Sequence, residues 1–180
     1  MQEGIHPHHM SQAMEACGKE KYPRPALTVD MLIFMEGKLL LIRRGRPPYE
    51  GMWAAPGGFV EPNETVEQAA ARELLEETSL EGCVPQLLQV YSKPGRDPRG
   101  WTVSCAFTAA APENACPRAG DDAAEARWFS VSKTAEGYTL TGKDAVLTID
   151  TEETGVYKSS RGLAFDHGEM VLDALHYWGI

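Results

Sequence analysis

The sequence predicts an α/β fold in which a mixed β-sheet lies between helices. β-Favouring stretches recur along the chain, two segments show helical periodicity, and the two kinds of segment do not alternate strictly. With 180 residues and 43% hydrophobic content, the chain suits one globular domain with a full core. We expect this domain over residues 23–180, after a flexible polar arm over residues 1–22.

The first two elements are expected to be antiparallel strands. The segments Leu27–Phe34 and Lys38–Arg44 are aliphatic and rich in β-favouring residues. Glu36-Gly37 between them is the kind of pair that turns a hairpin.

A helix is expected next. Thr65 and Gln68, three residues apart, form a capping box that would begin it. Val66, Ala70 and Leu74 then recur at helical spacing and predict its buried edge.

The second half of the chain predicts further strands and a closing helix. Leu87–Tyr91 and Trp101–Ala109 are expected strands on either side of the long polar loop Ser92–Gly100. Ala126–Phe129 predicts a short strand, and Asp166–Tyr177 predicts an amphipathic helix. Long polar loops in compact domains are often functional, so we expect residues 92–100 to contact a ligand.

Two local features near the C-terminus complete the predicted elements. Between Ser132 and Gly162 the pattern weakens, and we expect a long loop or an extra hairpin there. Asp166 is placed to cap the last helix, and His167 is expected to be a packed structural histidine.

Three glutamates predict the chemistry. Since a helix advances 100° per residue, Glu73, Glu76 and Glu77 fall within a sector of roughly 100° on one face. Like charges so close repel, and a hard divalent cation with oxygen ligands would relieve the repulsion. Taken alone, such a face is more often simply solvated.

The residues around these glutamates form a recognisable motif. Five residues separate Gly58 from Glu64, seven separate Glu64 from Arg72, and the glutamates follow at once. The stretch resembles the Nudix hydrolase box, G-x5-E-x7-R-E-U-x-E-E-x-G-U, where U is a bulky aliphatic residue. Only Ser79 departs, standing where the box has its second glycine. The resemblance implies the family's α/β/α sandwich over roughly residues 23–180.

The resemblance also implies site residues. Glu73, Glu76 and Glu77 would hold Mg²⁺, with Mn²⁺ as an alternative, and the carbonyl of Gly57 would point at the metal. Arg72 would orient a box glutamate through a salt bridge. The implied catalytic residues are therefore Arg72, Glu73 and Glu76.

Charged residues outside the box are further candidates. Glu125, beside Asp121 and Asp122, lies in a region from which related enzymes sometimes supply another catalytic carboxylate. A basic cluster on the second strand could contact phosphate or could be a solvated face; its members are Arg43, Arg44 and Arg46.

The substrate class is suggested by the polar loop. Pro94, fifteen residues beyond Ser79, resembles the proline of the ADP-ribose pyrophosphatase subgroup. Arg96 and Arg99 offer planar forks for phosphate or ribose oxygens, and Asp97 could accept from a sugar hydroxyl or lock the loop.

Aromatic side chains supply candidate surfaces for adenine. Trp53, Tyr91 and Trp101 could each stack on a base, although an aromatic residue in such a strand is more often part of the core.

Two functions remain open. The first is an enzyme that cleaves ADP-ribose to AMP and ribose 5-phosphate, or another nucleoside diphosphate derivative such as NADH, a sugar nucleotide or an oxidised nucleotide. The second is a sensor, because similar domains occur in transcription regulators that bind ADP-ribose. The chain ends at Ile180, directly after the closing helix, so we expect no DNA-binding domain and favour the enzyme.

Composition limits the kinds of partner and the cellular location that we expect for this protein. A formal charge of −9 disfavours a general nucleic-acid surface, which needs a basic face. No apolar run approaches the 18 or so residues that span a bilayer, and no signal peptide is evident, so a cytoplasmic protein is expected. Members of the family often dimerise, so a homodimer stays an open alternative.

Overall fold

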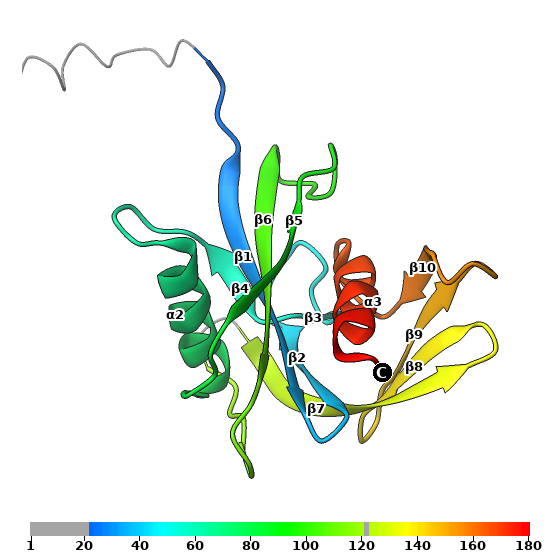
Figure 1. Cartoon of the computed structure of the whole chain (residues 1–180). Coiled ribbons are helices and arrows are strands. Elements are labelled where there is room, and N and C mark those ends of the chain that lie inside the picture. The colour runs from blue at the N-terminus through cyan, green and yellow to red at the C-terminus, as the bar shows by residue number, and fades with distance from the viewer. Residues whose placement is uncertain (1–21, 121–122) are drawn as a thin grey trace, which may run out of the picture.

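The computed structural model describes residues 22–120 and 123–180. The expected arm therefore lies outside the described residues except for Tyr22, as do Asp121 and Asp122. The described chain forms a ten-stranded mixed sheet flanked by helices α2 (Val66–Thr78) and α3 (His167–Trp178). Figure 1 shows the two helices on opposite sides of the central strands. The predicted α/β/α sandwich is confirmed.

The sheet is built around a parallel pair in its centre. The strands are β1 (Ala26–Met35), β2 (Lys38–Arg44), β3 (Trp53–Ala54), β4 (Gly57–Phe59), β5 (Gln86–Tyr91), β6 (Thr102–Ala110), β7 (Ala123–Thr134), β8 (Gly137–Thr141), β9 (Val146–Thr151) and β10 (Tyr157–Arg161). Their order is β10-β9-β8-β7-β2-β1-β6-β5, with β3 beside β2 and β4 beside β1. β1 and β6 are parallel, and the other pairings between these described strands are antiparallel.

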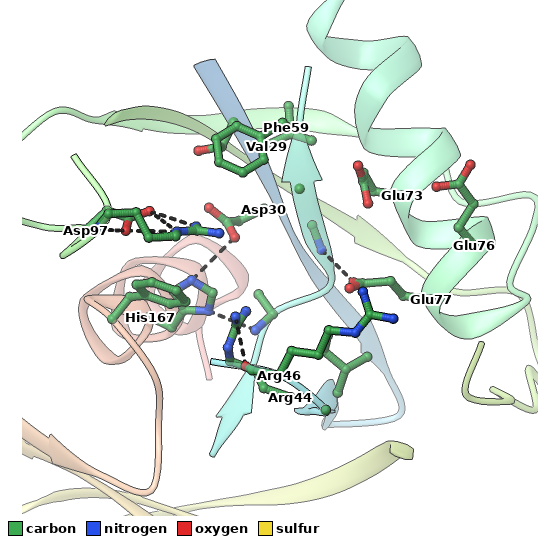
Figure 2. A pocket seen from close by; sticks show the side chains of 18 of the residues that line it. Val29, Asp30, Arg44, Arg46, Phe59, Glu73, Glu76, Glu77, Asp97 and His167 are labelled. Carbon is green, nitrogen blue, oxygen red and sulfur yellow. Dashed lines mark hydrogen bonds and ion pairs between the residues drawn. The ribbon is translucent and has the colours of Figure 1, made fainter. Parts of the chain in front are cut away.

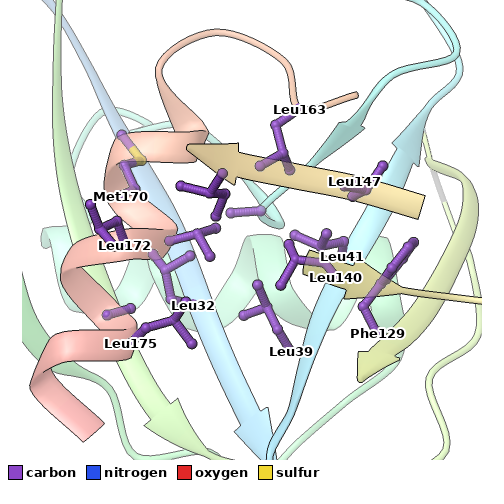
Figure 3. Close-up of a cluster of buried hydrophobic side chains, with 14 of the residues drawn as sticks. Leu32, Leu39, Leu41, Phe129, Leu140, Leu147, Leu163, Met170, Leu172 and Leu175 are labelled. Atoms are coloured by element: carbon purple, nitrogen blue, oxygen red, sulfur yellow. The ribbon is translucent and has the colours of Figure 1, made fainter. Parts of the chain in front are cut away.

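The two faces of β1 belong to two different cores. Val29, Met31 and Ile33 face α2, whereas Leu32 and Phe34 face α3. Figure 3 shows the second core, where Leu32 lies among leucines of β2 and α3. Burial on both faces explains why β1 is an almost continuous apolar run rather than an alternating one.

The local signals predicted most elements well. The hairpin of β1 and β2 closes at Glu36 and Gly37, which both have positive φ. The capping box at Thr65 and Gln68 is formed reciprocally, with both backbone amides satisfied by the side chains.

The region after Ser132 differs from its expectation. β7 extends to Thr134, and β8, β9 and β10 follow as an antiparallel meander, so a long loop was wrong and a hairpin alone was too little. In β8 and β9 buried apolar residues alternate with polar ones, and β10 is polar apart from the partly buried Tyr157, which weakens the apolar signal in the sequence.

Ser79 occupies the left-handed position that ends α2. Its backbone has φ 57° and ψ 21°, and its amide donates to the Leu75 carbonyl. A side chain is disfavoured in this conformation by about 1 kcal/mol relative to glycine. We therefore expect Ser79→Gly to raise the free energy of unfolding by about 1 kcal/mol. Urea melts of the two proteins would check this, and an equal or lower midpoint for the glycine variant would contradict it.

Among the described residues, no helix is long and apolar enough to cross a membrane.

Candidate active site

One pocket of about 420 Å³ gathers residues from distant parts of the chain. It lies where the middle of β1, the turn into β4, one face of α2, the polar loop and the start of α3 meet (Figure 2). Its charged and aromatic lining comprises Asp30, Arg44, Arg46, Phe59, Glu61, Arg72, Glu73, Glu76, Glu77, Arg96, Asp97, Arg99, Phe165 and His167. The volume suits a small molecule of nucleotide size.

Two glycines allow the β4 turn to approach both β1 and α2. A Cβ on Gly57 would lie 2.1 Å from the Val29 carbonyl oxygen, and a Cβ on Gly58 would lie 2.4 Å from a carboxylate oxygen of Glu73. Any side chain here would therefore push the turn away from the acidic face of α2. The absence of a Cβ is what brings turn and helix together.

Glu77 is buried in this contact. Its Oε2 accepts the Gly57 amide at 2.8 Å, and the residue is only 7% exposed. Burial raises the pKa of Glu77 to about 8, and the nearby Glu73 and Asp30 raise it further against the opposing effect of the amide. A positive ion in the pocket would favour the charged form of Glu77.

Arg72 holds the acidic face together. Its guanidinium donates to Glu64 at 3.1 and 2.6 Å, to Glu73 at 2.7 Å and to Glu76 at 3.1 Å, and to the Phe59 carbonyl at 3.0 Å. Hydrogen bonds to Glu64 raise the pKa of Arg72 above its ordinary value, although partial burial opposes this. The expected salt bridge between Arg72 and a box glutamate is therefore present.

The opposite wall of the pocket is basic. Arg96 makes two hydrogen bonds to Asp166, at 2.8 and 2.7 Å, and its side chain is 5% exposed. Asp166 stands at the N-cap position of α3 but makes no capping hydrogen bond, so its expected capping role was wrong. Its carboxylate instead ties the polar loop to α3.

Asp97 fixes the conformation of Arg99. It accepts from the Arg99 backbone amide at 2.9 Å and from the Arg99 guanidinium at 2.7 to 3.2 Å. Burial opposes the charge of Asp97, but the Arg99 hydrogen bonds outweigh it and hold the pKa of Asp97 below its usual value. Of the two roles considered for Asp97, the structure shows locking of the loop.

A buried polar network lies under the pocket. His167 Nδ1 accepts the Ala55 amide at 2.9 Å, and its Nε2 lies 3.3 Å from Asp30, whose other oxygen accepts from Ser104 at 2.5 Å. Because Nδ1 accepts, the proton of a neutral His167 is on Nε2 and points to Asp30. His167 is buried, as expected, and it links α3 to the chain that leads into the β4 turn.

A model of the NUDIX domain matches residues 24–147 of this chain, which include every residue of the motif. The chain belongs to the Nudix hydrolase family. This Nudix domain is 48% identical over 111 residues to an ADP-ribose pyrophosphatase of Methanocaldococcus jannaschii, an alignment that covers 62% of this chain and 65% of the relative. It is 44% identical over 99 residues to an ADPR responsive transcriptional repressor of Acinetobacter baylyi, and this alignment covers 51% of this chain and 39% of the relative. The chain thus spans less than two thirds of either relative.

A solved structure supports the fold. A MutT/nudix family protein from Enterococcus faecalis superimposes with a TM-score of 0.81 at 34% identity, covering 96% of this chain and 69% of that chain. The similarity therefore extends beyond the Nudix box to α3 and the meander.

The donor set of the Nudix box fits a hard divalent cation. Glu73, Glu76 and Glu77 present carboxylate oxygens to one pocket, and Glu77 is buried where a charge needs compensation. In the described part of the chain, no three acidic, histidine or cysteine side chains are placed to coordinate one metal ion together. Arg72 engages Glu73 and Glu76, and the Glu76 side chain, 44% exposed, has room to turn.

Several candidates lie away from the pocket that the described residues form. Arg43 donates to the Gly51 carbonyl and to Glu125, which in turn pairs with Arg127. Pro94 lies in the polar loop but does not line the cavity. Arg43 and Glu125 therefore form an ion pair on the surface of β2 and β7, and neither residue lines the pocket.

The three aromatic candidates are not at the pocket either. Trp53 is 6% exposed and packs edge-on against Phe129 in the core, so its stacking role is corrected to a structural one. Tyr91 is also 6% exposed, and its hydroxyl donates to Asp173 at 2.6 Å. Trp101 is 55% exposed but outside the lining.

Four charged or aromatic residues of the pocket escaped the sequence analysis: Asp30, Phe59, Glu61 and Phe165. Asp30 is a lone carboxylate inside an apolar strand, and that contrast was a usable signal. Phe59 and Phe165 gave no signal, because a phenylalanine beside a turn is expected to be core and only the fold shows that these two line the cavity.

Burial of His167 predicts a pH-dependent stability. Burial lowers the pKa of His167 below its ordinary value of about 6.5, although Asp30 and Asp166 oppose this. The unfolded chain then binds the proton more readily, so the stability contributed by His167 is present above about pH 6.5 and is lost as the pH falls. We expect the melting temperature to fall more steeply from about pH 7.5 to about pH 5.5 in the wild type than in His167→Asn, whose amide oxygen can still accept from Ala55. Parallel curves for the two proteins would contradict this.

Proposed function

We propose that this protein is a divalent-metal-dependent pyrophosphohydrolase that cleaves ADP-ribose to AMP and ribose 5-phosphate. One observation carries the proposal: the acidic face of α2 and a wall of arginines oppose each other across a single pocket of nucleotide size. Anionic phosphates are drawn to the arginines, and cations that bind phosphate are drawn to the glutamates. We infer Mg²⁺ as the metal, with Mn²⁺ as an alternative.

The pocket residues have separate roles in the hydrolysis of a phosphoanhydride bond. The reaction needs neutralised phosphate oxygens, a fixed diphosphate and a deprotonated water. Bound metal would supply neutralisation and a more acidic water, and Glu73, Glu76 and Glu77 would hold it. Arg72 keeps these carboxylates in place, and Glu76, the most exposed of them, is our candidate to accept the proton of the attacking water.

The basic wall supports a diphosphate substrate. Arg44 and Arg46 line the pocket from the end of β2, and Arg99 lines it from the polar loop. The guanidinium group of Arg44 is held in place by the Pro48 carbonyl at 2.7 Å, so little side-chain entropy is lost when it binds. Planar donors held this way suit phosphate oxygens.

ADP-ribose is chosen among nucleoside diphosphate derivatives because of the relative named ADP-ribose pyrophosphatase. That relative is 48% identical over the aligned part, but the alignment leaves out about a third of each protein. NADH, sugar nucleotides and oxidised nucleotides are therefore the alternatives that an experiment has to separate.

A sensor that binds ADP-ribose without cleaving it is the second candidate. It is favoured by the relative named as an ADPR responsive transcriptional repressor. The complete set of box glutamates and the arginine that holds them favour catalysis over binding alone.

Product release from a substrate panel tests both candidates. ADP-ribose, NADH, sugar nucleotides and nucleoside triphosphates would be incubated with the protein and Mg²⁺, and in parallel with a chelator. Preferential, chelator-sensitive release of AMP from ADP-ribose is the expected result. Binding of ADP-ribose with no cleavage of any compound would establish the sensor, and cleavage of a different compound would replace the substrate.

A further inference from the structure

The pocket has an aromatic wall whose role is unexplained by diphosphate chemistry. Phe59, on β4, is 46% exposed and follows the glycine turn directly. Phe165 precedes α3 and lines the same cavity. Neither ring is needed to hold metal or phosphate, and an exposed phenylalanine adds little to the core.

The guanidinium of Arg99 joins the two rings. It lies 5.0 Å from the ring centroid of Phe59 and 5.4 Å from that of Phe165, within the range of cation–π attraction. Asp97 holds Arg99 there with a side chain that is only 3% exposed. Figure 2 shows Phe59 and Asp97 on the side of the cavity away from Glu76.

The backbone of Phe165 is held in an unfavourable conformation. Its φ is 50°, in the left-handed region that a bulky residue rarely adopts. The neighbours fix it: Tyr49 packs edge-on at 4.8 Å between centroids, and Arg44 lies 4.9 Å from the ring. Strain of this kind is typically retained where it positions a side chain for binding.

We propose that Phe59, Arg99 and Phe165 form the stacking wall for the nucleobase of the substrate. Rings and a guanidinium plane present flat, polarisable faces, and a base stacked on them gains contact without needing a particular pattern of hydrogen bonds. Arg99, from the polar loop, and Phe165, before α3, line the cavity opposite α2, and the Phe59 ring extends the wall toward them from the turn beside α2. A base placed against Arg99 and Phe165 therefore leaves the diphosphate directed to the metal side. This assignment rests on the proposed function and deepens it, replacing Trp53, Tyr91 and Trp101 as base-binding surfaces.

Binding of two product fragments tests the wall without any catalytic readout. Calorimetric titrations with AMP and with ribose 5-phosphate, in Mg²⁺, would compare the wild type with Phe59→Leu and Phe59→Tyr. Leucine keeps apolar volume but removes the ring, and tyrosine keeps the ring. We expect Phe59→Leu to weaken AMP binding by about five- to fiftyfold, Phe59→Tyr to stay within about twofold, and ribose 5-phosphate binding to be unchanged in both.

Three results would overturn the wall: AMP binding that is the same in Phe59→Leu, AMP and ribose 5-phosphate weakened equally, or a wild type that binds no AMP. Phe165→Leu, measured alongside, should reproduce the selective loss of AMP binding if Phe59→Leu folds poorly. Cleavage of ADP-ribose by the wild type and by Phe59→Leu is measured in a separate assay. Cleavage of ADP-ribose with a KM that Phe59→Leu leaves unchanged would refute the wall alone, whereas ring-dependent AMP binding without cleavage would refute only the catalytic proposal.

Discussion

Glu77→Gln is expected to lower turnover of ADP-ribose by about a hundredfold or more while the protein stays folded. Glutamine has the same shape and can still accept the Gly57 amide, which Glu77 accepts at 2.8 Å. It cannot supply the negative charge that a metal ligand needs, and loss of such electrostatic stabilisation removes on the order of a hundredfold to a thousandfold in rate. Turnover under saturating Mg²⁺ and calorimetry of Mg²⁺ binding would measure both effects.

The same variant should be more stable than the wild type when metal is removed. The pKa of Glu77 is raised to about 8 in the folded chain, chiefly by burial, so the folded state resists its ionisation. The favourable contribution of the neutral carboxyl is present below its unfolded pKa and is lost as the pH rises toward 8, whereas glutamine never ionises. In a chelator near neutral pH, Glu77→Gln should therefore melt at a higher temperature.

Glu67→Gln is the matched control for Glu77→Gln. Glu67 lies on the same helix but is exposed and outside the pocket. We expect wild-type turnover from the Glu67 variant. Wild-type turnover from Glu77→Gln would remove Glu77 from the site, and a lower melting temperature in chelator would contradict the burial argument.

Arg72→Ala is expected to reduce both turnover and stability. The guanidinium joins Glu64, Glu73, Glu76 and the Phe59 carbonyl, so its removal leaves three carboxylates close together with no cation between them. Since the Arg72 side chain is 24% exposed, solvent screens part of the repulsion, and we expect a loss of about 1–3 kcal/mol in the free energy of unfolding. Turnover should fall by about a hundredfold because the glutamates lose their orientation.

Mg²⁺ should return part of the stability of Arg72→Ala, because a divalent cation would take over the compensation of charge. Thermal melts with and without Mg²⁺ would show a larger metal-dependent shift in this variant than in the wild type. Arg72→Lys should rescue poorly, since an ammonium cannot reproduce the fork that grips Glu64. Arg161→Ala, an exposed arginine on β10, is the control. A turnover for Arg72→Ala that matches this control would contradict the orienting role.

The sequence predicted the structure most accurately where the structure depends on residues that are close together in the chain. The capping box at Thr65, the shared face of the three glutamates and the left-handed end of α2 at Ser79 all follow from helical geometry over a few residues. The hairpin at Glu36 and Gly37 is equally local. These features placed the three glutamates correctly on one face of α2 before any tertiary contact was known.

Weak local patterns limited the prediction of the meander. In β9 the partly buried Thr148 separates the buried Leu147 from the buried Ile149, and Asp150 follows. So short an alternation can equally be interpreted as a loop. Pairing with the neighbouring strands β8 and β10 fixes the segment, and such pairing is not visible in the segment itself.

By itself the sequence determined the box helix and its carboxylate face, because both depend on contacts within about one or two turns. It determined the α/β class through the order of strand and helix patterns along the chain. Only the tertiary structure decided what opposes that face. Asp166 pairs with Arg96 across 70 residues instead of capping its own helix, and His167 reaches Ala55 across 112. Trp53 is in the core, while the phenylalanine of the β4 turn lines the cavity. Such assignments depend on which segments the sheet brings together, and that is a property of packing over the whole chain rather than of any local pattern.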